Sequence, residues 1–252
     1  MLAETDAPSR GYLALHQAEA ACAEMALLEF GSGYALWCRI LNVFLDAVLG
    51  EHDFTAPARD QAIAAQLRLA SVSLAAGTSK AVLDLCMRGA YTQGYALMRP
   101  VLEAWKLMVY LATQPSAGET FFATTEDGLP RAPDRRSINR AIREHLDSEV
   151  REAYAQVQSV AEFLNDHVHP SAYGLGQTAS STPGVGVVGA HFNDRLTVSL
   201  LDVGTFGSIL ILQEFARTLP SRDVPWVREL GEIVRQRDEW LETRNFPPGW
   251  SP

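Results

Sequence analysis

Three charged side chains interrupt an otherwise apolar segment between residues 91 and 112. Arg99, Glu103 and Lys106 are spaced by four and three residues, so in a helix they share one stripe. Such a stripe can be a solvated face with an ion pair. It can also face a cavity between helices, where bundles build their sites. In that case Arg99 would bind an anionic group, Lys106 would contact substrate, and Glu103 would act as a base or metal ligand.

Two histidines lie close together farther along the chain. His167 and His169 are two residues apart, and Pro170 favours an extended conformation at His169. Extended residues with this spacing point the same way, so both imidazoles can reach one ion or one substrate. With Glu103 they would form the two-histidine, one-carboxylate ligand set of many iron and some zinc sites. Both are therefore candidates for acid–base chemistry or for binding iron, manganese or zinc.

Two observations weigh against a metal. One histidine can instead cap the C-terminus of the preceding helix while the other packs inside. No HExxH motif accompanies the pair, which favours a site without metal.

The segment from 165 to 193 is rich in Gly, Ser and Thr, which predicts an irregular loop that can close over a site as a lid. Ser171 and His191, towards its two ends, are candidate substrate contacts. The glycines of residues 184–189 match the letters of a dinucleotide-binding motif. That motif needs a strand before it, and none is predicted, so we expect no dinucleotide cofactor.

A resemblance rests on Arg99, Glu103 and His169. An Arg-x3-Glu helix, followed about sixty residues later by His-Pro-Ser, resembles a group of bacterial all-helical domains of unknown function. The resemblance covers about residues 60–175. It implies a helical fold and brings no activity with it.

A second, more distant resemblance rests on Arg140 and His145. Their spacing is similar to the Arg-x4–6-His motif of HEPN domains, which implies metal-independent cleavage of RNA. Residue 141 is alanine, where that pattern prefers a polar residue. A solvated, charged helix explains this arginine-rich segment better.

The elements that must position these residues are helices. Good helix formers, terminal glycines and prolines, and the near absence of alternating patterns predict a single all-α domain over 1–252, with about seven or eight helices. Leu67, Leu74 and Ala81 recur every seven residues, as in a packing seam. The expected helices are 13–30, 34–49, 59–88, 91–112, 135–146, 149–164, 195–219 and 224–244, with irregular segments at about 115–134 and 165–193.

Composition sets further limits. The 252 residues are 47% hydrophobic and carry a net charge of −9, which disfavours nonspecific binding to nucleic acid and to anionic membranes. Only two of the 21 basic residues are lysines, a bias that points to a GC-rich bacterial genome. Cys22, Cys38 and Cys86 form no metal-binding pattern and are predicted to be small buried side chains in a reducing compartment.

The expected location is the cytoplasm. The first ten residues are acidic rather than basic, unlike a signal peptide. The longest apolar stretch, Val203–Gln213, is too short to span a bilayer. Trp226, Trp240 and Trp250 are expected to serve core packing or a homodimer face.

Three functions fit these patterns. The first is an enzyme acting on a small polar molecule, with its site built from the Arg99 stripe and the two histidines. The second is a non-catalytic binding or assembly protein in which Arg, Glu and His form a buried structural network. The third is a HEPN-like ribonuclease.

Overall fold

The computed structural model describes residues 10–50, 59–121, 134–145, 148–168 and 191–243. These residues form seven α-helices and one 3-10 helix, with no strand, around one continuous hydrophobic core. The predicted all-α bundle is therefore confirmed for the part of the chain that the structure describes. The elements are α1 (Arg10–Leu49), α2 (Arg59–Met87), α3 (Tyr91–Thr113), η1 (Pro115–Phe121), α4 (Arg135–His145), α5 (Ser148–Val168), α7 (Asp194–Arg217) and α8 (Pro225–Glu242).

Most of the helix boundaries predicted from the sequence lie close to those of the structure, and two differ. The expected break at residues 31–33 is a kink inside α1, where Phe30 leaves helical geometry (φ −128°, ψ 22°). Helix α5 continues to Val168, beyond the predicted end at Leu164. Asn193 is the N-cap of α7, and its side chain accepts a hydrogen bond from the Leu196 amide.

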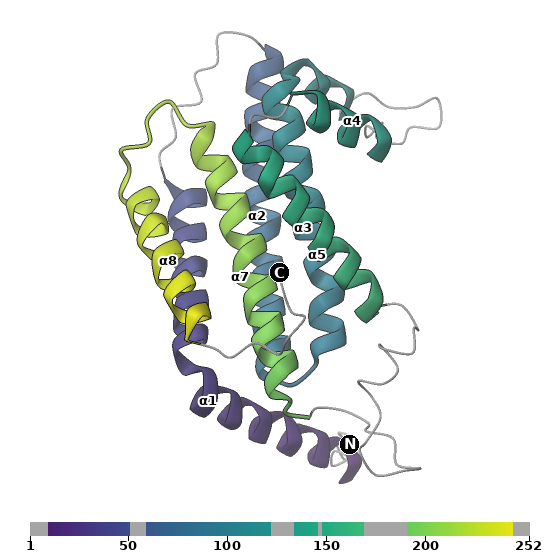
Figure 1. Ribbon diagram of the computed structural model, residues 1–252, viewed down its shortest axis with the longest axis vertical. Coiled ribbons are helices and arrows are strands. Elements are labelled where there is room, and N and C mark those ends of the chain that lie inside the picture. The colour runs from purple at the N-terminus through teal and green to yellow at the C-terminus, as the bar shows by residue number, and fades with distance from the viewer. Residues whose placement is uncertain (1–9, 51–58, 122–133, 146–147, 169–190, 244–252) are drawn as a thin grey trace, which may run out of the picture.

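Helix α7 lies at the centre of the bundle (Figure 1). In this view α1 and α8 lie on one side of it and α3 and α5 on the other, while α2 runs behind. Small residues allow these close approaches. The hydroxyls of Ser79 and Ser208 join α2 to α7 at 2.8 Å, and Gly204 lies against the ring of Trp37 from α1.

The packing seam of α2 differs from the predicted one. Leu74 is 56% exposed, and Leu67 and Ala81 are only half-buried. A seven-residue repeat does exist, but it is Ala65, Val72, Ser79 and Cys86, all buried. Small residues occupy this seam because α2 lies against both α3 and α7. The spacing of the leucines therefore predicted the wrong face of α2 as the buried one.

The cysteine prediction holds for two of three residues. Cys22 and Cys86 are buried, whereas Cys38 is exposed on the outer face of α1. Of the three tryptophans assigned to packing or a dimer face, Trp226 and Trp240 belong to the core, and Trp250 lies outside the described residues.

Three described helices are long and apolar enough, by length and composition, to cross a membrane. In α7 the apolar window is 89% buried inside the protein, so its hydropathy matches its central position. The windows in α1 and α2 are only 44% and 39% buried. Leu28 and Leu49 of α1 remain about three-quarters exposed, at 77% and 78%. The cytoplasmic location therefore stays a prediction.

Candidate functional site

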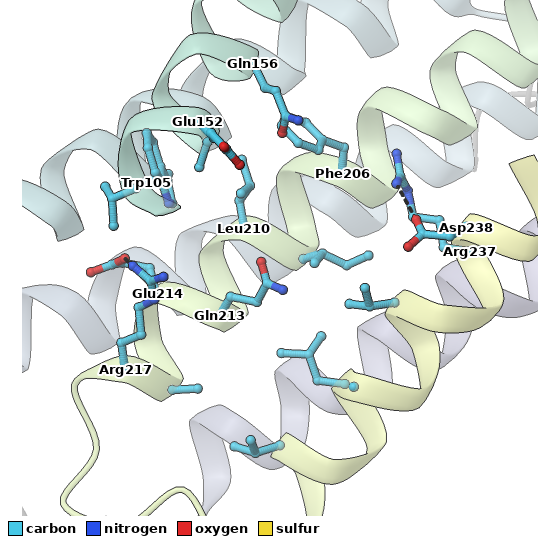
Figure 2. A pocket seen from close by; sticks show the side chains of 18 of the residues that line it. Trp105, Glu152, Gln156, Phe206, Leu210, Gln213, Glu214, Arg217, Arg237 and Asp238 are labelled. Atoms are coloured by element: carbon cyan, nitrogen blue, oxygen red, sulfur yellow. Dashed lines mark ion pairs between the residues drawn. The ribbon is translucent and has the colours of Figure 1, made fainter. Parts of the chain in front are cut away.

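A cavity of about 580 Å³ opens between α5, α7 and α8, with Trp105 of α3 at its inner end. We call it the α5–α7–α8 cavity. Its volume falls within the range of about 300–1,000 Å³ that is typical of small-molecule sites. Figure 2 shows Glu152 and Gln156 of α5 on one side of α7 and Arg237 and Asp238 of α8 on the other.

The floor of this cavity is apolar and its rim is polar. Helix α7 contributes to the floor through its C-terminal half, from Phe206 to Ala216. The apolar lining is Trp105, Val150, Ala153, Phe206, Ile209, Leu210, Ala216, Val227, Leu230 and Val234, and the polar lining is Glu152, Gln156, Gln213, Glu214, Arg217, Arg222, Arg237 and Asp238.

A second cavity of about 290 Å³ adjoins the first, and both are lined by Gln156, Phe206, Arg237 and Asp238. The guanidinium of Arg237 lies where the two meet, 6.0 Å from the centroid of the Phe206 ring. It is ion-paired with Asp202 and donates a hydrogen bond to Thr205 Oγ1 at 3.1 Å. Burial raises the pKa of Asp202, although Arg237 acts in the opposite direction.

A second buried carboxylate lies near the C-terminus of α7. Glu214 is 6% exposed and forms an ion pair with Arg217 at 3.9 Å. Burial lowers the pKa of Arg68 from α2, and the carboxylate of Glu214 opposes that effect. Glu214 is therefore paired with a guanidinium of its own helix, and its charge also favours the protonated form of Arg68 on α2.

The predicted stripe on α3 lies on another side of this helix. Glu103 and Trp105 are two residues apart, so they lie about 160° apart around the helix axis. Because Trp105 lines the cavity, Glu103 points away from it. The stripe therefore does not face this cavity.

Glu103 instead takes part in an ion-pair network with α4. Lys106, which is 5% exposed, donates a hydrogen bond to Glu103 Oε1 at 3.4 Å. Arg135 of α4 lies 3.7 Å from Glu103 Oε2. Arg99 is half-buried and forms no ion pair within the described ranges. This arrangement resembles the structural alternative predicted for the stripe.

The register of α5 on α3 bears on the predicted metal site. The rings of Tyr95 and Phe163 lie 5.5 Å apart. Trp105, ten residues later on α3, shares the cavity with Ala153, ten residues earlier on α5. The two helices are therefore antiparallel. His167, in the last turn of α5, is level with the start of α3.

That register separates His167 from Glu103 by about 18 Å along α3, at about 1.5 Å per residue. His167 is also helical, so the extended pairing with His169 that the sequence indicated is wrong at this position. His169 and Ser171 lie outside the described residues. Among the residues that are described, no cluster of three His, Cys, Asp or Glu side chains can hold a metal. The predicted iron, manganese or zinc site stays a prediction.

His191 lies at the opposite end of α3 from Lys106. Its ring contacts Tyr91, the first residue of α3, edge to face with centroids 5.9 Å apart. The hydroxyl of Tyr91 is hydrogen-bonded to the Thr197 hydroxyl at 2.8 Å and accepts a hydrogen bond from the Asn193 backbone amide at 3.1 Å. The structure thus brings His191 to the start of α7 and not to Glu103.

The proposed ribonuclease residues lie on α4. Arg140 is exposed on its outer face. His145 is the last residue of that helix. The ribonuclease alternative stays untested.

Sequence patterns did contain a signal for the observed cavity. Asp202 and Glu214 bound the longest apolar stretch of the chain. A charged residue next to such a stretch is buried along with it and then needs a partner. In the structure both acids are buried and paired with arginines. Arg217 stands three residues from Glu214 in the sequence, but the partner of Asp202 could not be read from sequence, because Arg237 lies on another helix.

No model of a protein family, no curated protein and no solved structure matches this chain. The resemblances to uncharacterised bacterial domains and to HEPN domains therefore stay predictions.

Proposed function

We propose that this protein binds a small amphipathic molecule in the α5–α7–α8 cavity. The observation that carries the proposal is the combination of volume and lining. About 580 Å³ of space lies over an apolar floor and under a rim of amides, carboxylates and guanidiniums. An apolar body would lie against Phe206, Leu210 and Leu230, where it removes apolar surface from water. The polar end would remain at the rim.

Binding, rather than catalysis at the α3 stripe, fits the arrangement of charges. Glu103 is engaged by Lys106 and Arg135, and these contacts tie α4 to α3. A carboxylate held in this way supports the non-catalytic alternative. An enzyme that uses His167 and His169 remains the second candidate only on sequence grounds.

We propose a cytoplasmic location on the basis of the α1–α8 interface. Arg39 lies within the apolar stretch of α1 and donates hydrogen bonds to Glu229 of α8 at 2.8 and 2.6 Å. It also donates one to Gln236. The outer face of α8 carries further ion pairs between Arg235 and two glutamates. Such a charged helix beside α1 favours water over lipid.

Gly231 provides a sharp test of the proposed site. It lines the cavity from α8, and a Cβ atom added there meets nothing within 4 Å. Gly231→Phe should therefore fill the cavity without disturbing the helix packing. Gly77→Phe is the matched control, because Gly77 is an exposed helical glycine on α2 with equally open surroundings.

The assay is titration with the uncharged dye Prodan, whose emission shifts to the blue in apolar surroundings. We expect saturable binding of one dye by the wild type and by Gly77→Phe, and at least a tenfold weaker affinity for Gly231→Phe. The proposal fails if no saturable binding is seen. It also fails if all three proteins bind equally, because the dye would then lie elsewhere.

A further inference from the structure

The lining of the α5–α7–α8 cavity includes two exposed, charged side chains of opposite sign from different elements. Glu152 lies on α5, and Arg222 lies on the connection between α7 and α8. Both are exposed. Neither side chain has an ion-pair partner within the described part of the chain.

The other charges of the lining are already paired. Arg217 is paired with Glu214. Arg237 is paired with Asp202 and lies 3.5 Å from Asp238. The complete lining holds three arginines against two glutamates and one aspartate, so its formal charges balance. Glu152 and Arg222 are the charged groups that remain available to a ligand.

From this arrangement we propose that the ligand is a zwitterion with an apolar body, carrying both an ammonium group and a carboxylate or another anionic group. The ammonium would pair with Glu152 and the anionic group with Arg222, while the apolar body covers the α7 floor. This inference rests on the proposed function, since it assigns a ligand class to the same cavity.

A ligand of single charge fits the site less well. A simple carboxylate could pair with Arg222, but it would also repel Glu152 and leave that group without compensation at the mouth. An amine would have the reverse problem. A zwitterion can pair with both groups and adds no net charge to a balanced lining. Gln156 and Gln213, also on the rim, offer amide donors and acceptors to either group.

Three probes with the same chain length separate these possibilities. They are 2-aminodecanoic acid, decanoic acid and decylamine at pH 7, where the amino and carboxyl groups are charged. Each is measured by calorimetry with the full chain and by displacement of Prodan. We expect the zwitterion to bind most tightly, by about fivefold over either singly charged probe, as befits exposed ion pairs.

Two charge-neutralising variants assign the groups. Arg222→Gln should weaken the binding of the zwitterion and of decanoate about fivefold. The affinity for decylamine should stay unchanged or increase. Glu152→Gln should weaken the binding of the zwitterion and of decylamine and leave the affinity for decanoate unchanged. Arg228→Gln is the control, because Arg228 is exposed on α8, is paired with Asp223 and does not line the cavity. It should change none of the three affinities.

The outcomes separate the ligand class from the existence of the site. If Prodan binds in a Gly231-dependent way but a singly charged probe matches or exceeds the zwitterion, the zwitterion proposal is overturned and the cavity stands. The same holds if no probe displaces the dye, or if Arg222→Gln and Glu152→Gln act alike on all probes. If Prodan itself does not bind, both proposals fall.

Discussion

Replacing Gly204 with alanine probes the closest approach in the bundle, where α7 meets α1. The added Cβ atom would lie 1.9 Å from Cη2 of Trp37 and 2.4 and 2.6 Å from two further ring carbons. Carbon atoms pack best at about 3.5–4.0 Å, so the ring or the helix must move by roughly 1.6 Å. Trp37 is fully buried, and its rigid ring has no free direction in which to rotate.

The expected cost follows from two opposing effects. Overpacking of a well-packed core destabilises by about 1–3 kcal/mol, and a rigid buried ring favours the upper end of that range. Alanine is the better helix former by about 1 kcal/mol. The net loss in the free energy of unfolding is therefore about 2 kcal/mol. In a chain of this size that lowers the melting temperature by roughly 4–8 °C.

Two other glycines calibrate the measurement. At Gly77 an added Cβ meets nothing within 4 Å, so Gly77→Ala should raise the free energy of unfolding by about 0.5–1 kcal/mol. At Gly207 the nearest atom is the terminal methyl of Met98 at 2.7 Å. That side chain is flexible and can yield, so Gly207→Ala should lie between the other two variants.

The assay is urea and thermal denaturation of the three variants, followed by circular dichroism. The reasoning predicts the stability order Gly77→Ala, Gly207→Ala, Gly204→Ala, with only the first above the wild type. A Gly204→Ala protein as stable as the wild type would refute the close approach of α1 and α7.

Two further predictions concern the charged groups. Glu103→Gln should lower the free energy of unfolding by about 1–2 kcal/mol, because Lys106 is left buried without its partner. Adding Lys106→Met to the same chain should restore most of that loss. If urea denaturation shows that the losses of the two variants simply add, the ion-pair role is contradicted. The pKa of Asp202 is raised in the folded chain, so the protonated carboxyl group favours the folded chain at low pH. This contribution to stability disappears as the pH rises from about 4 through the raised pKa. The stability of the wild type relative to Asp202→Asn should therefore decrease over that window, and a constant or increasing difference in denaturation from pH 3.5 to 7.5 would refute the burial effect.

Local sequence signals determined most of the helices. Terminal glycine and proline positions, an Asn N-cap and long runs of helix-forming residues act within a few residues of the chain, so they can be read without tertiary information. For this reason Gly50, Asn193 and Pro225 stand where the structure ends or begins helices. The predicted end of the first helix before Gly31 was only partly right, because packing against the bundle keeps α1 continuous through a kink.

The buried faces of the helices were harder to predict. The stripe of Arg99, Glu103 and Lys106 was correctly placed on one helix, but the sequence did not say which neighbour that helix would face. A helix repeats its pattern every 3.6 residues whatever lies beside it. Only packing decided that Trp105 faces the cavity while Glu103 faces α4.

What the sequence determined by itself is the all-α fold, because helix propensity and capping are local properties of the chain. What only the tertiary structure decided is the candidate site. Asp202 and Arg237 are 35 positions apart, and Glu152 and Arg222 are farther apart still, so no spacing rule connects them. They come together because α7, flanked by α5 and α8, leaves space above its apolar surface, and the existence of that space depends on how three helices pack.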